Sequence, residues 1–278
     1  MVNAVQTTEL ARAKINLFLH VGARRADGYH ALQSLAVFAE VGDELRFEEA
    51  DELSLAIEGP FAHLLAASDD NLILRAARAL GARARIVLTK NLPVASGIGG
   101  GSADAAAALR ALGAGRADLM DIAARIGSDV PVCVASRSSW MEGRGEHLAG
   151  APPIPDFWLV LVNPRVAVPT GQVFAGLERR RGSGMDYPTS FKDLRELIAF
   201  LRTTGNDLEE PACKIAPVIR TVLDRLNAEG ALLSRMSGSG ATCFAMVEDA
   251  QAARSLAQRL IDTTDWWVAA TALAPRTQ

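Results

Sequence analysis

The stretch that decides the fold reads Pro93-Val94-Ala95-Ser96-Gly97-Ile98-Gly99-Gly100-Gly101-Ser102-Ala103-Asp104, and an alanine-rich run follows it at once. Backbone that lacks Cβ atoms can approach an anion closely and adopt positive φ. Its N–H groups, beside the N-terminus of a helix, favour the binding of a phosphate. The stretch therefore predicts a phosphate-binding loop that runs into a helix, with Ser102 as a natural N-cap.

Two common nucleotide motifs do not fit this loop. No lysine follows Gly101, as a P-loop NTPase would require, and Ser102 stands where a dinucleotide fingerprint has its third glycine. The alternative is a glycine-rich turn between a strand and a helix that binds nothing.

Composition indicates a globular protein of one large domain or two ordinary ones. The 278 residues are 49% hydrophobic and 22% charged, which is enough for a buried core. The net charge is −3, and no basic stripe points to nucleic acid. The short cluster Arg179-Arg180-Arg181 is expected to be a solvated loop.

Targeting and redox signals are weak throughout. Cys133, Cys213 and Cys243 are far apart and form no Cys-x-x-Cys pair, and the four histidines show no metal-ligand spacing with them. Residues 1–9 lack the basic and apolar regions of a secretion signal, and no apolar run is long enough to cross a bilayer. We therefore expect a cytoplasmic chain with no membrane partner and buried, reduced cysteines.

Several strands precede the first helices, which favours an α+β fold over a regular alternating α/β fold. Alternating or apolar runs predict strands at 15–19, 31–38, 43–47, 52–57, 83–90, 157–162, 241–247 and 266–272, and 130–134 is also strand-like. Helical spacing predicts helices at 70–80, after the glycine loop, and at 117–126, 170–177, 190–202, 213–228 and 249–261. Three prolines within 152–155 interrupt both helix and strand. They predict a boundary between two domains, 1–153 and 154–278.

Four further motifs accompany the loop. They are Ala13-Lys14-Ile15-Asn16-Leu17, Arg25-Ala26-Asp27-Gly28-Tyr29-His30, Gly127-Ser128-Asp129-Val130-Pro131 and Met236-Ser237-Gly238-Ser239-Gly240-Ala241-Thr242. In this order and at these spacings, the set resembles the GHMP kinases over nearly the whole chain. The resemblance implies a two-domain α+β fold. Its N-terminal ATP-binding domain would be ribosomal protein S5 domain 2-like, and its C-terminal domain ferredoxin-like.

The resemblance assigns the chemistry to two residues. Asp129 matches the family's catalytic aspartate, which would accept the proton of the attacking hydroxyl. Lys14 matches the lysine that orients this aspartate, keeps it ionised and offsets developing negative charge. Taken singly, Lys14 could be an exposed lysine at a strand start, and Asp129 a cap or turn residue after Gly127.

On the acceptor side, the resemblance implies a cytidine-diphosphate-linked methylerythritol, phosphorylated on a hindered tertiary 2-hydroxyl for non-mevalonate isoprenoid synthesis. Asn16, Tyr29 and His30 match acceptor-side residues. Tyr29 and Phe174 would stack on the two faces of cytosine, while His30 would bind its edge. Thr170 is expected to cap its helix and also to touch the substrate. Isolated aromatic residues are otherwise more often core or surface side chains.

On the donor side, the backbone from Pro93 to Ala103 would hold the ATP phosphates, and Asn71 would approach the nucleotide. Mg²⁺ would bind mainly through phosphate oxygens and water, with Ser102 as a further ligand. Asp104 has a sufficient alternative role in its favourable interaction with the helix dipole. The Gly238–Gly240 turn either packs near the loop or is a tight connection without a ligand. GHMP relatives often have glycine where this chain has Ala95 and Ser96.

Three rival functions remain. Another GHMP kinase would act on mevalonate, homoserine or a sugar, and would not need the Asp27-Gly28-Tyr29-His30 motif. A catalytically silent nucleotide-binding relative would not need both Lys14 and Asp129. A dinucleotide-dependent oxidoreductase is disfavoured by the broken fingerprint. The sequence leaves a monomer and a homodimer equally open.

Overall fold

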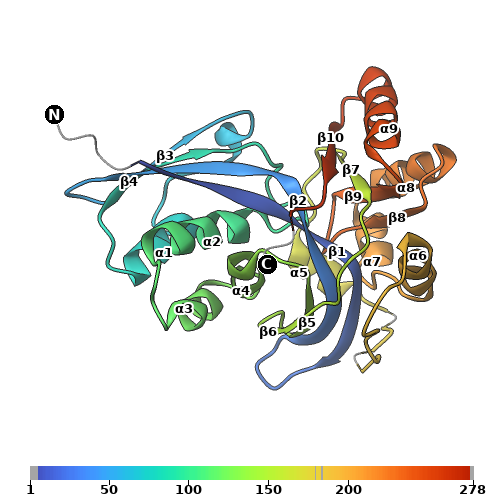
Figure 1. Cartoon of the computed structure of the whole chain (residues 1–278), viewed down its shortest axis with the longest axis horizontal. Coiled ribbons are helices and arrows are strands. Elements are labelled where there is room, and N and C mark those ends of the chain that lie inside the picture. Colours follow the sequence, from blue (N-terminus) through green and yellow to red (C-terminus); the bar gives the residue numbers. More distant parts are fainter. Residues whose placement is uncertain (1–5, 179, 183, 276–278) are drawn as a thin grey trace. The chain divides into compact units, whose positions relative to one another are not determined.

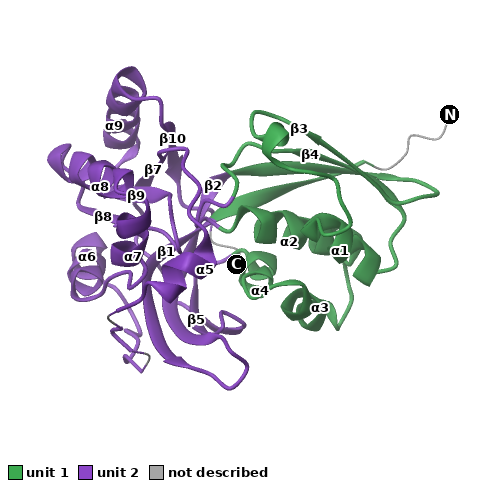
Figure 2. Cartoon of the chain, turned by 180° about the vertical axis from the view of Figure 1, so that it is seen from behind, with its two compact units in different colours: residues 1–13, 42–94, 99–136 green, residues 14–41, 95–98, 137–278 purple. Residues whose placement is uncertain are grey.

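The computed structural model describes residues 6–178, 180–182 and 184–275 (Figure 1). Residues 1–5, part of the stretch examined for a secretion signal, and Arg179 of the arginine cluster lie outside the described residues. The chain divides into two compact units, each assembled from separate segments (Figure 2). Unit 1 comprises Met1–Ala13, Gly42–Val94 and Gly99–Ser136, and unit 2 comprises Lys14–Val41, Ala95–Ile98 and Arg137–Gln278.

Strands and helices are both abundant, in agreement with the predicted α+β class. The strands are β1 (Thr7–Arg24), β2 (His30–Glu49), β3 (Ser54–Glu58), β4 (Ala84–Thr89), β5 (Ser139–Gly143), β6 (His147–Gly150), β7 (Trp158–Asn163), β8 (Leu233–Met236), β9 (Cys243–Val247) and β10 (Trp267–Ala272). The helices are η1 (Ala62–Leu64, a 3-10 turn), α1 (Leu72–Ala79), α2 (Gly100–Leu112), α3 (Leu119–Ile126), α4 (Val130–Ala135), α5 (Thr170–Ala175), α6 (Leu194–Thr203), α7 (Glu209–Ile215), α8 (Val218–Ala228) and α9 (Ala250–Thr263).

Unit 1 is a sheet covered by helices. Strand β4 pairs in parallel with β3 and antiparallel with the second half of β2, so that Leu45 lies opposite Leu88. Helices α1 to α4 gather on one side of β3 and β4 (Figure 2). Helix α2 presents buried alanines to its neighbours α1 and α4, and these small side chains allow the helices to pack closely.

Unit 2 contains a four-stranded antiparallel sheet in the order β10-β7-β9-β8. Strand β7 lies between β10 and β9, and residues 159–163 are all buried, in keeping with its continuous apolar run. Helix α8 packs on β8 and β9, and helix α9 packs on β7 and β10. In the same unit, the first half of β2 pairs with β5, which pairs with β6.

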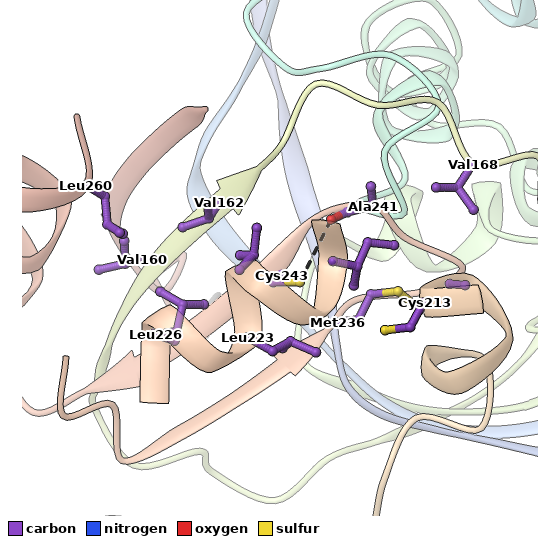
Figure 3. Close-up of a cluster of buried hydrophobic side chains, with 14 of the residues drawn as sticks. Val160, Val162, Val168, Cys213, Leu223, Leu226, Met236, Ala241, Cys243 and Leu260 are labelled. Carbon is purple, nitrogen blue, oxygen red and sulfur yellow. Dashed lines mark hydrogen bonds between the residues drawn. The ribbon is translucent and has the colours of Figure 1, made fainter. Parts of the chain in front are cut away.

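One apolar core holds the segments of unit 2 together. Val160 and Val162 of β7 meet Leu223 and Leu226 of α8 there, with Cys243 of β9 among them (Figure 3). Leu19 and Val21 of β1 belong to the same core, although more than a hundred residues separate them from β7 in the sequence. The opening strand is therefore part of the packing of unit 2.

The strand-like reading of residues 130–134 is wrong. The segment forms helix α4, in which Pro131 takes one of the first two helical positions, where its missing N–H costs nothing. The predicted helix 213–228 is two helices, α7 and α8, because Pro217 forms the N-cap of the second. The predicted strands 31–38 and 43–47 form one long strand, β2.

Candidate functional site

The glycine loop has the backbone that the sequence predicts for close approach to an anion. Ala95, Gly97 and Gly99 have φ of 50°, 76° and 68°, so three residues in five adopt the left-handed region. Alternation of this kind turns successive N–H groups toward a common centre. An alanine at this φ is strained.

Helix α2 begins directly after this loop. Gly99 is its N-cap, and the N–H of Ala103 donates to the Gly99 carbonyl at 2.8 Å. Ser102 is therefore the third residue of the helix, and its prediction as the N-cap is wrong because the glycines themselves supply the helix start. Its side chain is partly exposed in the first turn.

Within unit 2, the loop interlocks with the Ser237–Gly240 turn. Ser237 Oγ donates to the Gly97 carbonyl at 3.0 Å, and the N–H of Thr242 donates to the Ser96 carbonyl at 3.0 Å. A Cβ on Gly97 would lie 2.3 Å from the Ser237 carbonyl oxygen. The prediction that this turn packs near the loop is confirmed, and Gly97 is required there because no side chain fits.

Strand β1 joins the same arrangement in unit 2. The N–H of Asn16 donates to Ser237 Oγ at 3.1 Å, and the N–H of Lys14 donates to the Ile98 carbonyl at 2.9 Å. The Asn16 amide donates to Ser34 Oγ at 2.8 Å. The side chains of Lys14 and Asn16 are buried, so Lys14 is not the exposed lysine of the alternative interpretation. A buried ammonium is retained in proteins only with polar or anionic partners.

Two further side chains support the turn. The amide of Asn206 donates to the carbonyls of Met236 and Gly238 at 2.8 and 2.7 Å. The hydroxyl of Thr170, the first residue of α5, lies 2.8 Å from Ser239 Oγ. Thr170 therefore does not cap α5, whose N-cap is Pro169.

The aromatic residues predicted to bind a base lie in unit 2. The rings of His30 and Phe174 are stacked, with centroids 5.7 Å apart and an interplanar angle of 17°. His30 Nδ1 lies 3.2 Å from the Gly22 carbonyl oxygen, within hydrogen-bonding distance. Tyr29 is 53% exposed, and the guanidinium of Arg144 lies 5.0 Å from the centre of its ring.

The Gly143–Glu146 turn, to which the sequence assigns no role, holds Arg144 in this position. The N–H of Arg144 donates to Glu146 Oε2, and a guanidinium nitrogen of Arg144 lies 3.7 Å from Glu146 Oε1. Gly143 has φ of 71°, and a Cβ there would lie 2.5 Å from Glu146 Oε2. The glycine thus makes room for the carboxylate that orders the turn.

Unit 1 carries the remaining candidates. Asp129 occupies the N-cap position of α4, yet its side chain makes no capping hydrogen bond to that helix. Asn71 caps α1, since its Oδ1 accepts from the Ile73 N–H at 3.0 Å, and its amide donates to the Ala66 carbonyl at 3.3 Å. Asn71 therefore has a structural role that its sequence alone did not indicate.

Sequence reasoning missed a buried ion cluster in unit 1. Lys90 Nζ donates to Asp43 Oδ2 at 2.5 Å and to Asp104 Oδ2 at 2.8 Å, and all three side chains are buried. Burial opposes the charge on Lys90, but the two carboxylates outweigh it and raise its pKa. Burial raises the pKa of Asp104 to about 8, against the opposing effect of Lys90. Because α2 begins at Gly100, Asp104 lies beyond its first turn, and its observed partner is Lys90.

A signal for this cluster was present in the sequence. Asp43 alternates with Leu45 and Phe47, which places all three on the buried face of β2. A carboxylate in that register needs a buried partner.

The residues around the loop fit a divalent cation that arrives with a nucleotide. Among the described residues, no group of three or more His, Cys, Asp or Glu side chains is arranged to hold a metal. Mg²⁺ is usually bound by one or two protein oxygens together with phosphates and water. Ser102, a partly exposed residue in the first turn of α2, carries an oxygen of this kind.

The described helices include none with the length and apolar character needed to span a membrane.

Two family models match the chain. The GHMP kinases N terminal domain matches residues 71–137, which contain the glycine loop, and the GHMP kinases C terminal model matches residues 187–263. Among curated relatives, the 4-diphosphocytidyl-2-C-methyl-D-erythritol kinase of Cereibacter sphaeroides is 54% identical over 272 residues, covering 95% of this chain and 98% of the relative. That of Paracoccus denitrificans is 51% identical over 271 residues, covering 96% and 97%.

Solved structures agree with these matches. A crystal structure of 4-(cytidine 5'-diphospho)-2C-methyl-D-erythritol kinase has a TM-score of 0.77 at 33% identity and covers 97% of this chain and all of its own. The mevalonate kinase of L. major in complex with R-mevalonate has a TM-score of 0.68 at 13% identity, which shows a shared fold. The two-domain GHMP kinase fold predicted from the motifs is thus confirmed. The chain is an ATP-dependent kinase that belongs to the 4-diphosphocytidyl-2-C-methyl-D-erythritol kinase family of the GHMP kinases.

Proposed function

We propose that this protein transfers the γ-phosphoryl group of ATP to the 2-hydroxyl of 4-diphosphocytidyl-2-C-methyl-D-erythritol. The products are ADP and the 2-phosphate, in the non-mevalonate route to isoprenoid precursors. The observation that carries the proposal is the similarity over nearly the full length to kinases named for this substrate. The chain also carries the motif residues proposed to bind ATP and those proposed to bind the acceptor.

In the proposed reaction, the hydroxyl oxygen attacks the γ-phosphorus, the bond from that phosphorus to the β,γ-bridging oxygen breaks, and Asp129 accepts the hydroxyl proton. Asp129 suits this role because it matches the family's catalytic aspartate and stands at the N-cap position of α4. Lys14 keeps this carboxylate ionised and offsets charge that develops on the transferred group. A hydroxyl on a tertiary carbon is hindered, so correct placement matters as much as basicity.

The backbone of residues Pro93 to Ala103 binds the ATP phosphates in this proposal, and Asn71 approaches the nucleotide from the start of α1. The positive φ values within the loop support this role, since they turn N–H groups toward an anion. Ser102 would supply a protein ligand to Mg²⁺ bound with ATP, and the ion would neutralise phosphate charge.

On the acceptor side, we assign the cytosine ring to Tyr29, His30 and Phe174, with Asn16 and Thr170 beside the remainder of the substrate. Phe174 already lies parallel to an aromatic ring, that of His30, and Tyr29 offers an exposed face. Aromatic faces bind bases by stacking. We further propose that the sequence divides into domains 1–153 and 154–278. The protein acts in the cytoplasm as a monomer or homodimer, without nucleic-acid or membrane partners.

A coupled ADP-release assay tests this function. Purified protein is given ATP and Mg²⁺ with 4-diphosphocytidyl-2-C-methyl-D-erythritol, mevalonate, homoserine or galactose. Turnover with the first acceptor alone is the expected result. Preference for another acceptor would make the protein a different GHMP kinase, and absence of turnover with all four would overturn the proposal.

A further inference from the structure

The Lys90 cluster, formed by Lys90, Asp43 and Asp104, is buried in unit 1 beside the two ends of the glycine loop. The side chains of Lys90, Asp43 and Asp104 are at most 4% exposed. Asp43 comes from β2, Lys90 follows β4, and Asp104 lies on α2, so three elements of unit 1 converge on one ammonium.

Asp43 also binds the backbone at the entrance to the loop. Its Oδ1 accepts from the N–H groups of Asn91 at 2.6 Å and Leu92 at 2.8 Å. Pro93, where the candidate nucleotide loop begins, is the next residue. One carboxylate therefore fixes the course of the chain immediately before the loop, through bonds that a charged acceptor makes stronger than neutral ones.

The same cluster reaches the other end of the loop. Lys90 binds Asp104 of α2, and a Cβ on Gly100, the first residue of that helix, would lie 3.1 Å from Lys90 Nζ. The helix start thus packs directly on the ammonium. Asp43 and Lys90 together tie the residues before the loop to the helix after it.

We propose that Asp43 is a positioning residue for nucleotide binding, because it and Lys90 fix the separation between the two ends of the phosphate loop. The inference rests on the proposed function, in which this loop binds ATP. A shift of the loop ends would move the N–H groups that contact phosphate. Small misplacements of such binding groups greatly weaken nucleotide binding. A purely structural ion cluster would instead lower stability without preference for either substrate.

Asp43→Asn tests this proposal. The variant keeps the size of the side chain and an oxygen for the two backbone N–H groups, but it turns an amide donor toward the Lys90 ammonium. We expect the Kd for ADP, measured by titration calorimetry well below the Tm, to rise by about 10-fold or more. The KM for ATP should rise with it, whereas the KM for the acceptor and kcat at saturating ATP should change by less than about 3-fold.

The matched control is Asp118→Asn. Asp118 also pairs with a cation in unit 1, Arg116 at 2.8 Å, but the pair is exposed and lies outside the loop. The Kd for ADP of this variant should equal that of the wild type, because an exposed pair contributes little. A wild-type Kd for ADP in folded Asp43→Asn, or equal losses for ATP and acceptor, would overturn the proposal.

Lys90→Met is the second variant, and it covers the case in which Asp43→Asn does not fold. It keeps the two backbone bonds of Asp43 and removes the link to Asp104. The Kd for ADP should rise by about 3- to 10-fold with the acceptor KM unchanged; an unchanged ADP Kd would overturn the proposal. Because ADP binding is measured without an acceptor, failure of the proposed substrate assignment remains distinguishable from failure of this inference.

Discussion

Among single residues, Asp129 has a proposed role that can be separated from binding. Asn at this position has the same shape but cannot accept the proton of the attacking hydroxyl. We expect Asp129→Asn to lower kcat by about 10²- to 10⁴-fold and to leave the Kd for ADP unchanged. Stopped assays at saturating substrates and calorimetry measure the two quantities. Asp121→Asn, an exposed carboxylate on α3, is the control, and wild-type turnover by Asp129→Asn would remove the base assignment.

Tyr29 tests the acceptor side. Its ring is exposed on a loop and is proposed to stack on cytosine, so truncation should act on acceptor binding alone. We expect Tyr29→Ala to raise the acceptor KM by about 10-fold or more, since stacking on one base contributes about 1–3 kcal/mol. Tyr29→Phe keeps the ring and should keep most of the affinity. An unchanged acceptor KM in Tyr29→Ala would exclude the stacking role.

His20 makes the stability of the protein depend on pH. Burial lowers the pKa of His20 below its ordinary value of 6.5; nearby Asp207 opposes this shift, whereas Arg181 and Arg235 add to it. The unfolded chain therefore binds the proton more readily, and stability is lost as the pH falls below about 6.5. We expect the Tm to fall less in His20→Gln than in the wild type between about pH 7.5 and about pH 5.5. Exposed His63→Gln is the control, and parallel wild-type and His20→Gln curves would refute the assignment.

Single residues differ in how far the sequence reveals their role. Gly97 could be predicted to need the space of a missing side chain, because it lies in a run of glycines before a helix. Its partner Ser237 could not be predicted, since a hydroxyl that bridges Asn16 and Gly97 depends on contacts between segments distant in the sequence. The burial of Asp43 could be predicted from the alternation of polar and apolar residues in β2. Its pairing with Lys90 could not, because Lys90 follows a different strand, β4.

At the scale of elements, the glycine loop and the Ser237–Gly240 turn form one steric unit. Gly97→Ala combines a φ of 76° with a clash against the Ser237 carbonyl oxygen. Such strain costs about 1–3 kcal/mol, and about 1 kcal/mol shifts Tm by roughly 2–4 °C in a chain of this size. We expect a lower Tm and a higher KM for ATP in Gly97→Ala. Thermal melts and ATP titrations of the assay measure both.

Gly150→Ala is the matched control for this prediction. Gly150 ends β6, and a Cβ there would meet no atom within 4 Å. Its Tm and ATP KM should stay at the wild-type values. Equal behaviour of the two variants would show that the loop tolerates a side chain at position 97 and would remove the steric account.

Two short apolar runs show where prediction of elements from sequence ends. Residues 130–134 and 241–247 have similar composition, yet the first is in helix α4 and the second contains strand β9. A run of this length carries too few periods to distinguish the two, so the neighbours decide. Helix α4 packs on α2, whereas β9 lies between β7 and β8. The pattern at 70–80 spans about three helical turns, and its buried and exposed faces made α1 predictable.

At the scale of the whole molecule, the sequence shows segments in order but not the interleaving of the two units. The proline-rich stretch 152–155 is a sound signal for a change in local structure. It gives no information on β1 and β2, each of which contributes residues to both units. Strand pairing depends on partners far along the chain, so this division cannot be read from a local signal. The proposed division at 153 and 154 is thus a division of the sequence, and independent folding of either part is a separate question.

The packing of unit 2 predicts that the fragment 154–278 does not fold on its own. Its core would lack Leu19 and Val21. The carboxylate of Asp207 would no longer accept a hydrogen bond from the Val21 N–H. The guanidinium of the buried Arg235 would no longer donate to the Leu17 carbonyl. We expect no cooperative thermal transition in this fragment by circular dichroism. Joining residues 14–41 to 137–278 through a flexible linker should restore a transition, because each lost partner returns. A cooperative transition in 154–278 alone would show that the core of unit 2 does not need the opening strand.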